Sequence, residues 1–428
     1  MKELEQLSKE NEQLKLAVNE LSVLNDIATS ISTTQPIETI IDTIVLKCVN
    51  YLKTEEGTIS LLSEEDDEQK FRTFIRKRDE TRERLPIQLD EQVTGWMLNN
   101  KKALLSNDLH NDSRFSLPQY VDQSLKSMLS VPLIVKGKFI GYIAVFNKKN
   151  IDGFIAGDQR LLTIIGSQSA QLLERSRLYK EEQELLLIKE EMNVAKRIQN
   201  NLLPEKSPYL KGYLVSGTNS SAKEIGGDYF DFISISDTKF GFCIADITGK
   251  GMPAALLMSN LQALLRSQVQ IERDLSKAIA AVNNLLFQST DSTKFATLFY
   301  GVLDIENHTI IYCNAGHDEG LVFRNGVHSS SLASTGLILG IMPDMEYEIG
   351  EISLNPGDSL VCYTDGVTEA MNVKEEEFGI EKTIEVIEAI EGHTALKIEK
   401  GIIKAIREHS EGTSQSDDIT IVVIHREK

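Results

Sequence analysis

The chain has 428 residues, of which 41% are hydrophobic and 25% charged, so it is long enough for two folded domains and too long for one ordinary core. This composition is typical of globular proteins and excludes long disordered or collagen-like stretches. The net charge of -19 excludes a general nucleic-acid binder, because such binding depends on Lys and Arg that neutralise phosphates. Residues 1–30 mix charged residues with isolated aliphatic ones and offer neither a signal-peptide core nor a membrane span, so we expect a cytoplasmic protein.

The cysteines and histidines give no sign of a zinc site. The four cysteines are far apart, lie in apolar stretches and form no CxxC pair, which predicts buried free thiols. None of the seven histidines has the short spacing of a zinc-binding pair. Any metal in this protein is therefore expected to be held mainly by oxygen.

The first 23 residues carry a heptad pattern. Apolar residues recur with alternating gaps of three and four, and an asparagine occupies one *a* position: the set is Leu4, Leu7, Asn11, Leu14, Val18 and Leu21. This pattern predicts a short coiled coil over residues 1–23 that pairs with another chain. A lone amphipathic helix that packs on its own domain remains the alternative.

Residues 24–177 read as an α+β unit with helices at both ends and strands between them. The clearest part is Met128–Lys148, where two apolar runs flank a turn at Lys136–Lys138. Such a pattern predicts an antiparallel hairpin.

This region is similar to a GAF domain. The similar segments are Ser130–Leu133, Gly141–Phe146, and Asp158 leading into a helix that contains Gln168 and Ala170. The resemblance implies an α/β sensor domain. It does not identify a ligand, since GAF domains bind cyclic nucleotides, haem, other small molecules or nothing.

A second heptad-like run occupies residues 178–204. Its apolar positions are interrupted by Glu181 and Gln199, and Pro204 ends it: the positions are Leu178, Leu185, Ile188, Met192, Ala195 and Leu202. We expect a linker helix that pairs in a parallel homodimer and stops at the proline. A plain helical spacer fits the same pattern.

Residues 205–428 alternate short strands with a few helices. Predicted strands are Phe230–Ile235, Phe240–Ile247, Phe295–Ile305, Thr309–Cys313, Leu321–Arg324, Leu360–Thr364 and Ile419–His425. Predicted helices are Pro253–Gln268 and Asp274–Phe287, with more helix after Ile380. Because short turns join several of the strands, this pattern favours an antiparallel α+β domain.

Carboxylates recur at strand ends in this second half of the chain. Asp228 follows two glycines, Asp246 and Asp365 each end an apolar run, and Asp417 and Asp418 precede the last strand. Each alone fits a turn residue. A cluster of them, without interleaved Lys or Arg, resists ionisation unless a cation compensates it, and hard oxygen ligands favour Mg²⁺ or Mn²⁺.

Such a site predicts phosphoester hydrolysis. Two ions that share a bridging water lower its pKa and direct the hydroxide at phosphorus, so no Ser or Cys nucleophile is needed. No nucleophile elbow or CxxxxxR loop is apparent in the sequence.

The C-terminal half resembles the PPM family of metal-dependent protein phosphatases, in the bacterial branch of stage-II sporulation phosphatases and stress-response regulators. The matching segments, in order along the chain, are Gly226–Asp231, Asp246–Ala255, Ala296–Asp304, Asn314–His317, Tyr363–Glu369 and Asp417–Ile421. The resemblance implies a serine/threonine phosphatase domain over residues 205–428, folded as an α-β-β-α sandwich of two antiparallel sheets flanked by helices.

The same resemblance implies functional residues and a partner. It makes Asp228, Asp246, Asp365 and Asp417 the ligands of two Mn²⁺ or Mg²⁺ ions, with the carbonyl of Ile247 as a further ligand. Asp418 is the alternative at the last position. The implied substrate is a phosphorylated STAS-type anti-sigma-factor antagonist, with the GAF domain in control.

Two residues in the matching segments have no assigned role. Lys250 stands where the family often has His, and His317 lies at a strand end, where structural roles are commoner than catalytic ones. We therefore place His317 outside the metal ligands.

Two other functions remain open. Gly226–Phe230 is similar to the signature of a diguanylate cyclase, but it lies close to Pro204 rather than deep inside a domain, and a cyclase leaves the later acidic motifs unexplained. A phosphatase-like binding protein without metals is the non-enzymatic alternative, although all the acidic positions are occupied.

Overall fold

A computed structural model describes residues 35–62, 71–77, 87–114, 125–290 and 293–428, together with scattered helical positions between 6 and 29. The coiled coil predicted over residues 1–23 lies largely outside this part of the chain. The described residues divide into two compact units, Met1–Leu187 and Ile188–Lys428. A mixed architecture of helices and antiparallel sheets, as predicted, is confirmed.

The first unit contains one five-stranded antiparallel sheet with the strand order β2-β1-β5-β4-β3. Its elements are α2 (Ile37–Leu52), β1 (Thr54–Leu62), β2 (Phe71–Lys77), α3 (Ile87–Asn100), β3 (Leu104–Ser106), β4 (Met128–Val135), β5 (Lys138–Lys148) and the first part of α4 (Ala156–Asn200). The apolar stripe of α2, which includes Ile40, Ile44 and Cys48, packs with Ile143 of β5 in one core.

The predicted hairpin is confirmed. Strands β4 and β5 pair from Met128↔Phe146 to Val135↔Lys138, which leaves Lys136 and Gly137 as a two-residue turn. Both turn residues have positive φ, 47° and 83°, as a tight turn between twisted strands requires.

Helix α4 is one continuous helix of 45 residues. It includes both the last helix expected for the first domain and the expected linker helix. Backbone turns continue the chain to Leu203, and Pro204 follows. No helix among the described residues is long and apolar enough to cross a membrane.

The second unit contains two five-stranded antiparallel sheets, with the strand orders β13-β10-β9-β8-β7 and β12-β11-β14-β15-β6. The strands are β6 (Tyr213–Ser220), β7 (Tyr229–Ser234), β8 (Lys239–Ile247), β9 (Ala296–Asp304), β10 (Thr309–Ala315), β11 (Gly320–Arg324), β12 (Val327–Leu332), β13 (Gly350–Ser353), β14 (Ser359–Tyr363) and β15 (Ile419–Arg426). The helices are α5 (Met252–Ile271), α6 (Leu275–Ser289), α7 (Asp365–Thr368), α8 (Ile380–Glu388) and α9 (Ala395–His409).

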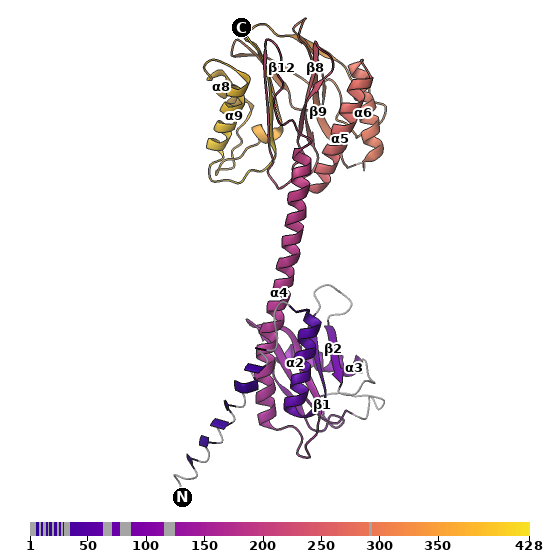
Figure 1. Ribbon diagram of the computed structural model, residues 1–428, viewed down its shortest axis with the longest axis vertical. Helices are drawn as coiled ribbons and strands as arrows, with labels where there is room; N and C mark the ends of the chain where they lie inside the picture. The colour runs from indigo at the N-terminus through magenta and orange to yellow at the C-terminus, as the bar shows by residue number, and fades with distance from the viewer. Residues whose placement is uncertain are drawn as a thin grey trace. The chain divides into compact units, whose positions relative to one another are not determined.

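Three cores hold the layers of this unit together. Helices α5 and α6 pack on the β7–β10 sheet, the inner faces of the two sheets share residues such as Phe299 and Val422, and α8 and α9 cover the other sheet. Figure 1 shows α5 and α6 on one side of the sheets and α8 and α9 on the other. Burial of these apolar faces is the main stabilising term, at about 25 cal/mol per Å².

Local signals set several element boundaries in this unit. Helix α6 begins where the side chain of Asp274 accepts a hydrogen bond from the Lys277 amide, and Thr394 caps α9 in the same way. All seven predicted strands are present with shifts of one or two residues. The sequence reading omitted β6, β12 and β13, which are all edge strands, and it treated Asp365 as a strand end although this residue begins α7.

The four cysteines, Cys48, Cys243, Cys313 and Cys362, are buried and free, as predicted.

Candidate metal centre

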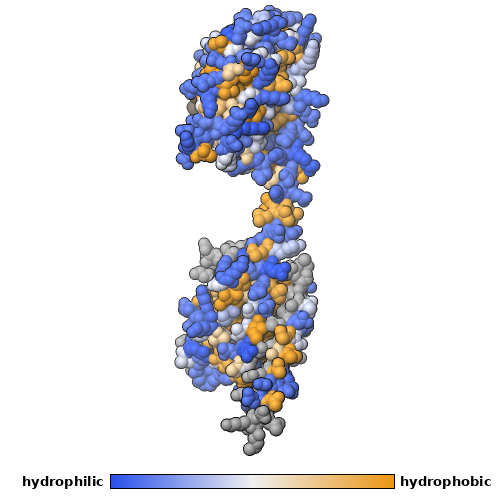
Figure 2. Space-filling model, turned by 90° about the vertical axis from the view of Figure 1, so that its left-hand side faces the viewer, coloured by the Kyte–Doolittle hydropathy of each residue, from blue (hydrophilic) through white to orange (hydrophobic). Residues whose placement is uncertain are grey.

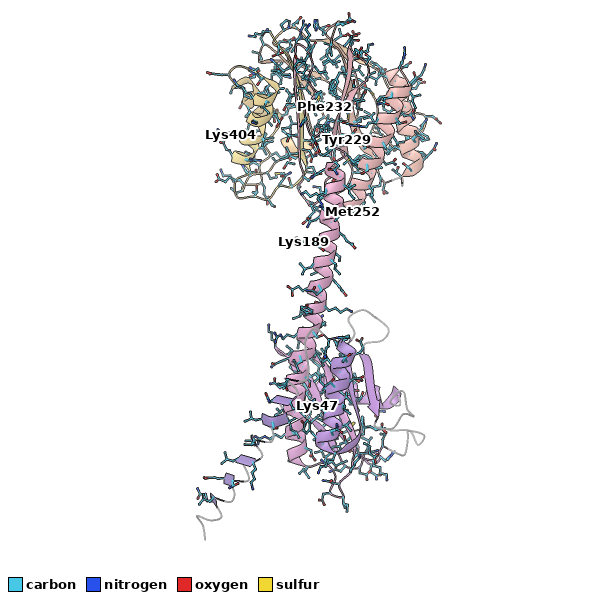
Figure 3. All side chains as sticks on the ribbon, viewed as in Figure 1. Lys47, Lys189, Tyr229, Phe232, Met252 and Lys404 are labelled. Atoms are coloured by element: carbon cyan, nitrogen blue, oxygen red, sulfur yellow. The ribbon has the colours of Figure 1, made fainter. Side chains whose placement is uncertain are left out.

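The predicted carboxylates occupy the ends of four strands in the second unit. Asp228 immediately precedes β7, Asp246 lies near the end of β8, Asp365 follows β14, and Asp417 lies just before β15. In Figure 3, Tyr229 at the start of β7 and Met252 at the start of α5 lie toward the same lower end of the sheets. The fold therefore brings residues that are far apart in sequence to one end of the two sheets.

Asp228 is the most deeply buried member of this group, with 3% of its surface exposed. Its Oδ2 atom accepts hydrogen bonds from the hydroxyl of Thr364 at 2.8 Å and from that of Thr420 at 2.6 Å. Burial and the neighbouring charge of Asp246 raise the pKa of Asp228 well above its usual range, and the two hydroxyls oppose this shift. The two hydroxyls thus hold in place a carboxylate whose ionised form its protein surroundings disfavour.

Neighbouring charges also disfavour the ionised forms of Asp246 and Asp365. Burial first, and then the charge of Asp365, raise the pKa of Asp246 to about 6. The Asp246 carboxyl also lies within hydrogen-bonding reach of Asp228. Burial, and then Asp417, raise the pKa of Asp365. The hydrogen bond with Asp228 lowers the pKa of Asp246, whereas the charges of Asp365 and Asp417 disfavour the ionised forms of Asp246 and Asp365, respectively.

Asp418 has a different role in this structure. Its Oδ1 accepts the amide hydrogen of Ala222 at 2.7 Å and its Oδ2 that of Gly227 at 2.6 Å. A Cβ at Gly226 would collide with the same carboxylate. Asp418 therefore holds the glycine turn that leads into Asp228.

The carbonyl of Ile247 faces the same turn. A Cβ at Gly227 would lie 3.1 Å from this oxygen and 3.3 Å from the Cβ of Ala254. The absence of a side chain at position 227 therefore allows the turn before Asp228 to approach the loop after Asp246.

The expectation that no Lys or Arg lies among the carboxylates is wrong, because Lys250 lies beside Asp417. The Nζ of Lys250 lies 2.8 Å from Oδ2 of Asp417 and donates to the carbonyl of Ser416 at 2.7 Å. The hydrogen bond to Asp417 raises the pKa of Lys250. One ammonium group therefore neutralises part of the cluster.

His317 lies behind the cluster. It is 6% exposed, and burial lowers its pKa to about 4, so the ring is neutral at pH 7. Its Nδ1 lies 2.8 Å from the hydroxyl of Thr297, which also accepts the amide hydrogen of Asp246 at 3.3 Å. His317 thus contacts the residue that supports Asp246 rather than Asp246 itself.

Two threonines that were not predicted from the sequence support the carboxylates. Thr364 directly precedes Asp365, Thr420 follows Asp418 by two positions, and both donate to the distant Asp228. A hydroxyl residue beside an acidic strand end was a signal that could have identified them.

The donor chemistry of this cluster fits a divalent cation, because its carboxylates disfavour ionisation and, among the described residues, the ion pair that they form is that of Lys250 with Asp417. Within the described parts of the chain, no three His, Cys, Asp or Glu side chains are already arranged to hold a metal ion. The carboxylates thus fit a divalent cation in donor type, although they are not arranged around an ion position in this structure.

Two known families match the chain. The stage II sporulation protein E (SpoIIE) family matches residues 236–427, and the GAF domain family matches residues 34–174. The expected similarity to both kinds of domain is thus confirmed.

Curated relatives and a solved structure agree with these matches. Phosphoserine phosphatase RsbU of *Bacillus subtilis* (strain 168) is 30% identical over 243 residues, which cover 56% of this chain and 71% of RsbU. Protein IcfG of *Synechocystis* sp. is 28% identical over 267 residues, 55% of this chain and 41% of IcfG, so the chain spans less than half of that relative. The SiaA-PP2C domain of *Pseudomonas aeruginosa* covers 57% of this chain and 99% of its own length, with a TM-score of 0.50 and 18% identity, which is a likeness of fold.

Proposed function

Since this chain belongs to the SpoIIE-type PP2C family of serine phosphatases and carries a GAF domain ahead of the phosphatase domain, we propose that it is a metal-dependent protein serine/threonine phosphatase. The observation that supports this function best is the cluster of one buried and several half-buried carboxylates at one end of the two sheets, of which Asp228, Asp246 and Asp365 have raised pKa values. On this proposal, residues 1–23 are a coiled coil, 24–177 a GAF-like sensor, 178–204 a linker helix and 205–428 the phosphatase domain.

Asp228, Asp246, Asp365 and Asp417, with the carbonyl of Ile247, would hold two Mn²⁺ or Mg²⁺ ions. When bound, such ions lower the pKa of a shared water and neutralise phosphate oxygens. The protein's own contribution is to hold the carboxylates in place: through the hydroxyls of Thr364 and Thr420 at Asp228, and through the ammonium of Lys250 at Asp417.

The direct test is hydrolysis of a phosphoserine peptide with added Mn²⁺ or Mg²⁺. We expect turnover that a chelator abolishes and that Asp246→Asn or Asp365→Ala removes, because loss of a ligand weakens metal binding. The exposed Asp237, changed to Asn, is the matched control. A protein that binds its phosphorylated partner but does not hydrolyse it would instead be the phosphatase-like binding protein.

We propose as substrate a phosphorylated STAS-type anti-sigma-factor antagonist. This rests on the family, whose relative RsbU is named a phosphoserine phosphatase. Incubation with each phosphorylated antagonist of the same cell should reveal one that is dephosphorylated much faster than the others. Equal, slow action on all of them would contradict a dedicated partner.

Helix α4 supports the proposal of a parallel homodimer. Its middle carries exposed apolar side chains, among them Leu185 at 66%, Leu187 at 62% and Ile188 at 56% exposure. Figure 2 shows hydrophobic residues gathered on this part of the helix. Pairing with a second copy would remove this apolar surface from water.

The C-terminal end of α4 offers a route from the sensor to the catalytic site. Gln199, which is 7% exposed, donates from Nε2 to the carbonyl of Gly226 at 2.8 Å, two residues before Asp228. A shift of the helix would therefore move the turn that carries a metal ligand, and catalysis tolerates little displacement.

Insertions near Gln183 test this control. Seven residues preserve the heptad phase, whereas four change the local winding, so the two variants should differ in basal and signal-stimulated activity. If both variants, and a protein that begins near Pro204, match the full chain in rate and metal dependence, the helix is only a tether.

A further inference from the structure

A pocket of about 270 Å³ adjoins the carboxylate cluster. It lies on the side of the β12-β11-β14-β15-β6 sheet that α9 covers. Its walls come from the last turns of α9, the end of β6, the start of β15, the start of α7 and the segment 414–416. Ser220 at the end of β6 pairs with Ile419 at the start of β15, so the pocket opens at the end of the sheet that carries Asp417 and Asp365.

The walls of this pocket are bonded to the metal-ligand candidates. Gln415 donates from Nε2 to the carbonyls of both Ser220 and Asp417, each at 2.7 Å. Asn219 donates to the Thr420 hydroxyl at 2.8 Å, and that hydroxyl donates to Asp228. Two pocket side chains are therefore connected to the groups that would surround a bound phosphate.

Two further wall positions are chain neighbours of the acidic residues. Gly366 directly follows Asp365, and Ser416 directly precedes Asp417. An extended peptide chain spans about 3.3 Å per residue. If the phosphorylated residue of a substrate lies at the carboxylate cluster, the residues one or two positions away from it would therefore lie beside Gly366 and Ser416.

The lining combines an apolar wall with polar groups and one cation. Ile403 and Ile406 of α9 contribute apolar surface, whereas Ser410 and Ser414 contribute hydroxyls. Arg407 is exposed and forms no salt bridge with any described residue. The guanidinium of Arg407 can donate hydrogen bonds to a carboxylate, and the apolar wall beside it can contact the aliphatic part of the same side chain. This combination fits a Glu or Asp side chain.

We infer that this pocket is a substrate subsite, which receives residues next to the phosphorylated residue and places an acidic side chain of the substrate against Arg407. The inference rests on the proposed phosphatase function and adds a sequence preference to it. The net charge of the chain is -19, so the protein as a whole repels an acidic peptide. Arg407 would attract an acidic side chain at one position of the peptide only, which makes the preference specific to that position.

The test compares kcat/KM of the full chain, with Mn²⁺, on phosphoserine peptides in which one Glu or one Lys is moved through the flanking positions. *p*-Nitrophenyl phosphate, which has no flanking residues, is the reference substrate. At one position we expect a preference for Glu of about three- to fivefold, the effect of an exposed ion pair. Arg407→Glu should reverse this preference in favour of Lys, as measured by the ratio of kcat/KM for the Glu and Lys peptides within each variant.

Lys404→Glu is the matched control on the same helix. Lys404 is 78% exposed, projects from α9 in Figure 3 and does not line the pocket, so its reversal should leave the peptide preference as in the wild type. Ser414→Trp should fill the pocket and lower kcat/KM more on the peptides than on p-nitrophenyl phosphate.

The outcomes separate the two proposals. If the wild type hydrolyses neither substrate with Mn²⁺, the proposed function fails. If it hydrolyses both without a preference at any position, or if Arg407→Glu keeps the preference for Glu, the subsite is overturned and the phosphatase stands. An equal loss on both substrates in Ser414→Trp also overturns the subsite, because the pocket wall then supports the catalytic site itself.

Discussion

Two buried aspartates, three positions apart, have opposite surroundings. Asp231 on β7 is 0% exposed and accepts hydrogen bonds from Arg266 at 2.6 and 2.8 Å and from the Tyr229 hydroxyl at 2.6 Å. Asp228 is 3% exposed and accepts only neutral donors from side chains, while Asp246 repels its charge. A buried carboxylate that the fold compensates serves stability, whereas one left uncompensated is available to a cation.

The largest effect is expected for Asp228→Asn. The amide retains an acceptor for the threonine hydroxyls but removes a charged ligand, so phosphatase turnover should fall by about 10²–10³-fold. In chelator, the variant should be at least as stable as the wild type, because one repelling charge is gone. Turnover assays and thermal denaturation measure the two effects, and a large loss of stability in chelator would make Asp228 a structural residue.

Arg266→Met, in contrast to Asp228→Asn, should lower the stability of the fold. It leaves Asp231 buried with the Tyr229 hydroxyl but without its cation, which should lower the free energy of unfolding by about 3 kcal/mol. Urea denaturation measures this value. The double variant Asp231→Asn/Arg266→Met should recover part of the loss, and a single variant that unfolds like the wild type would show that the ion pair does not stabilise the fold.

These contrasts show what sequence reasoning can and cannot provide. The acidic strand ends were predictable because each Asp lies at the end or start of an apolar run, with a glycine directly beside Asp228 and Asp365, and so was the turn at Lys136. The contact between Lys250 and Asp417 was not, since the two residues are 167 positions apart and only the sheet arrangement joins them.

The same limit explains the strands that were missed. Strands β6, β12 and β13 are at sheet edges, and β12 in particular, Val327–Leu332, contains three serines and one His, so its hydrophobic pattern is weak. The pairing of Asp231 with Arg266 crosses from a strand to a helix and likewise leaves no periodic trace in the sequence.

His317 shows a third arrangement, in which a buried titratable group remains neutral. Burial holds its folded pKa at about 4, below the ordinary value of 6.5, so its contribution to stability is present above pH 6.5 and is lost as the pH falls toward 4. Relative to His317→Gln, the wild type should lose on the order of 3 kcal/mol over this range. Denaturation of both proteins at a series of pH values measures the difference, with the exposed His110→Gln as control. A difference that does not change with pH would contradict the buried neutral ring.

The smallest effect is expected for Thr420→Val. This change keeps the branched shape but removes one hydroxyl that orients Asp228, so the Mn²⁺ concentration for half-maximal activity should rise about tenfold. Thr309→Val, on β10, is the control. An unchanged metal requirement would show that the hydroxyl does not support the ligand.

Calorimetric titration of Mn²⁺ into the metal-free protein tests the central claim most directly, because it needs no substrate. We predict that the wild type and Asp237→Asn bind Mn²⁺ alike, and that Asp228→Asn, Asp246→Asn and Asp365→Asn each weaken binding by tenfold or more while remaining folded. Equal binding of Mn²⁺ by the wild type and all three variants, or no binding by the wild type, would contradict the assignment of this carboxylate cluster as the metal centre.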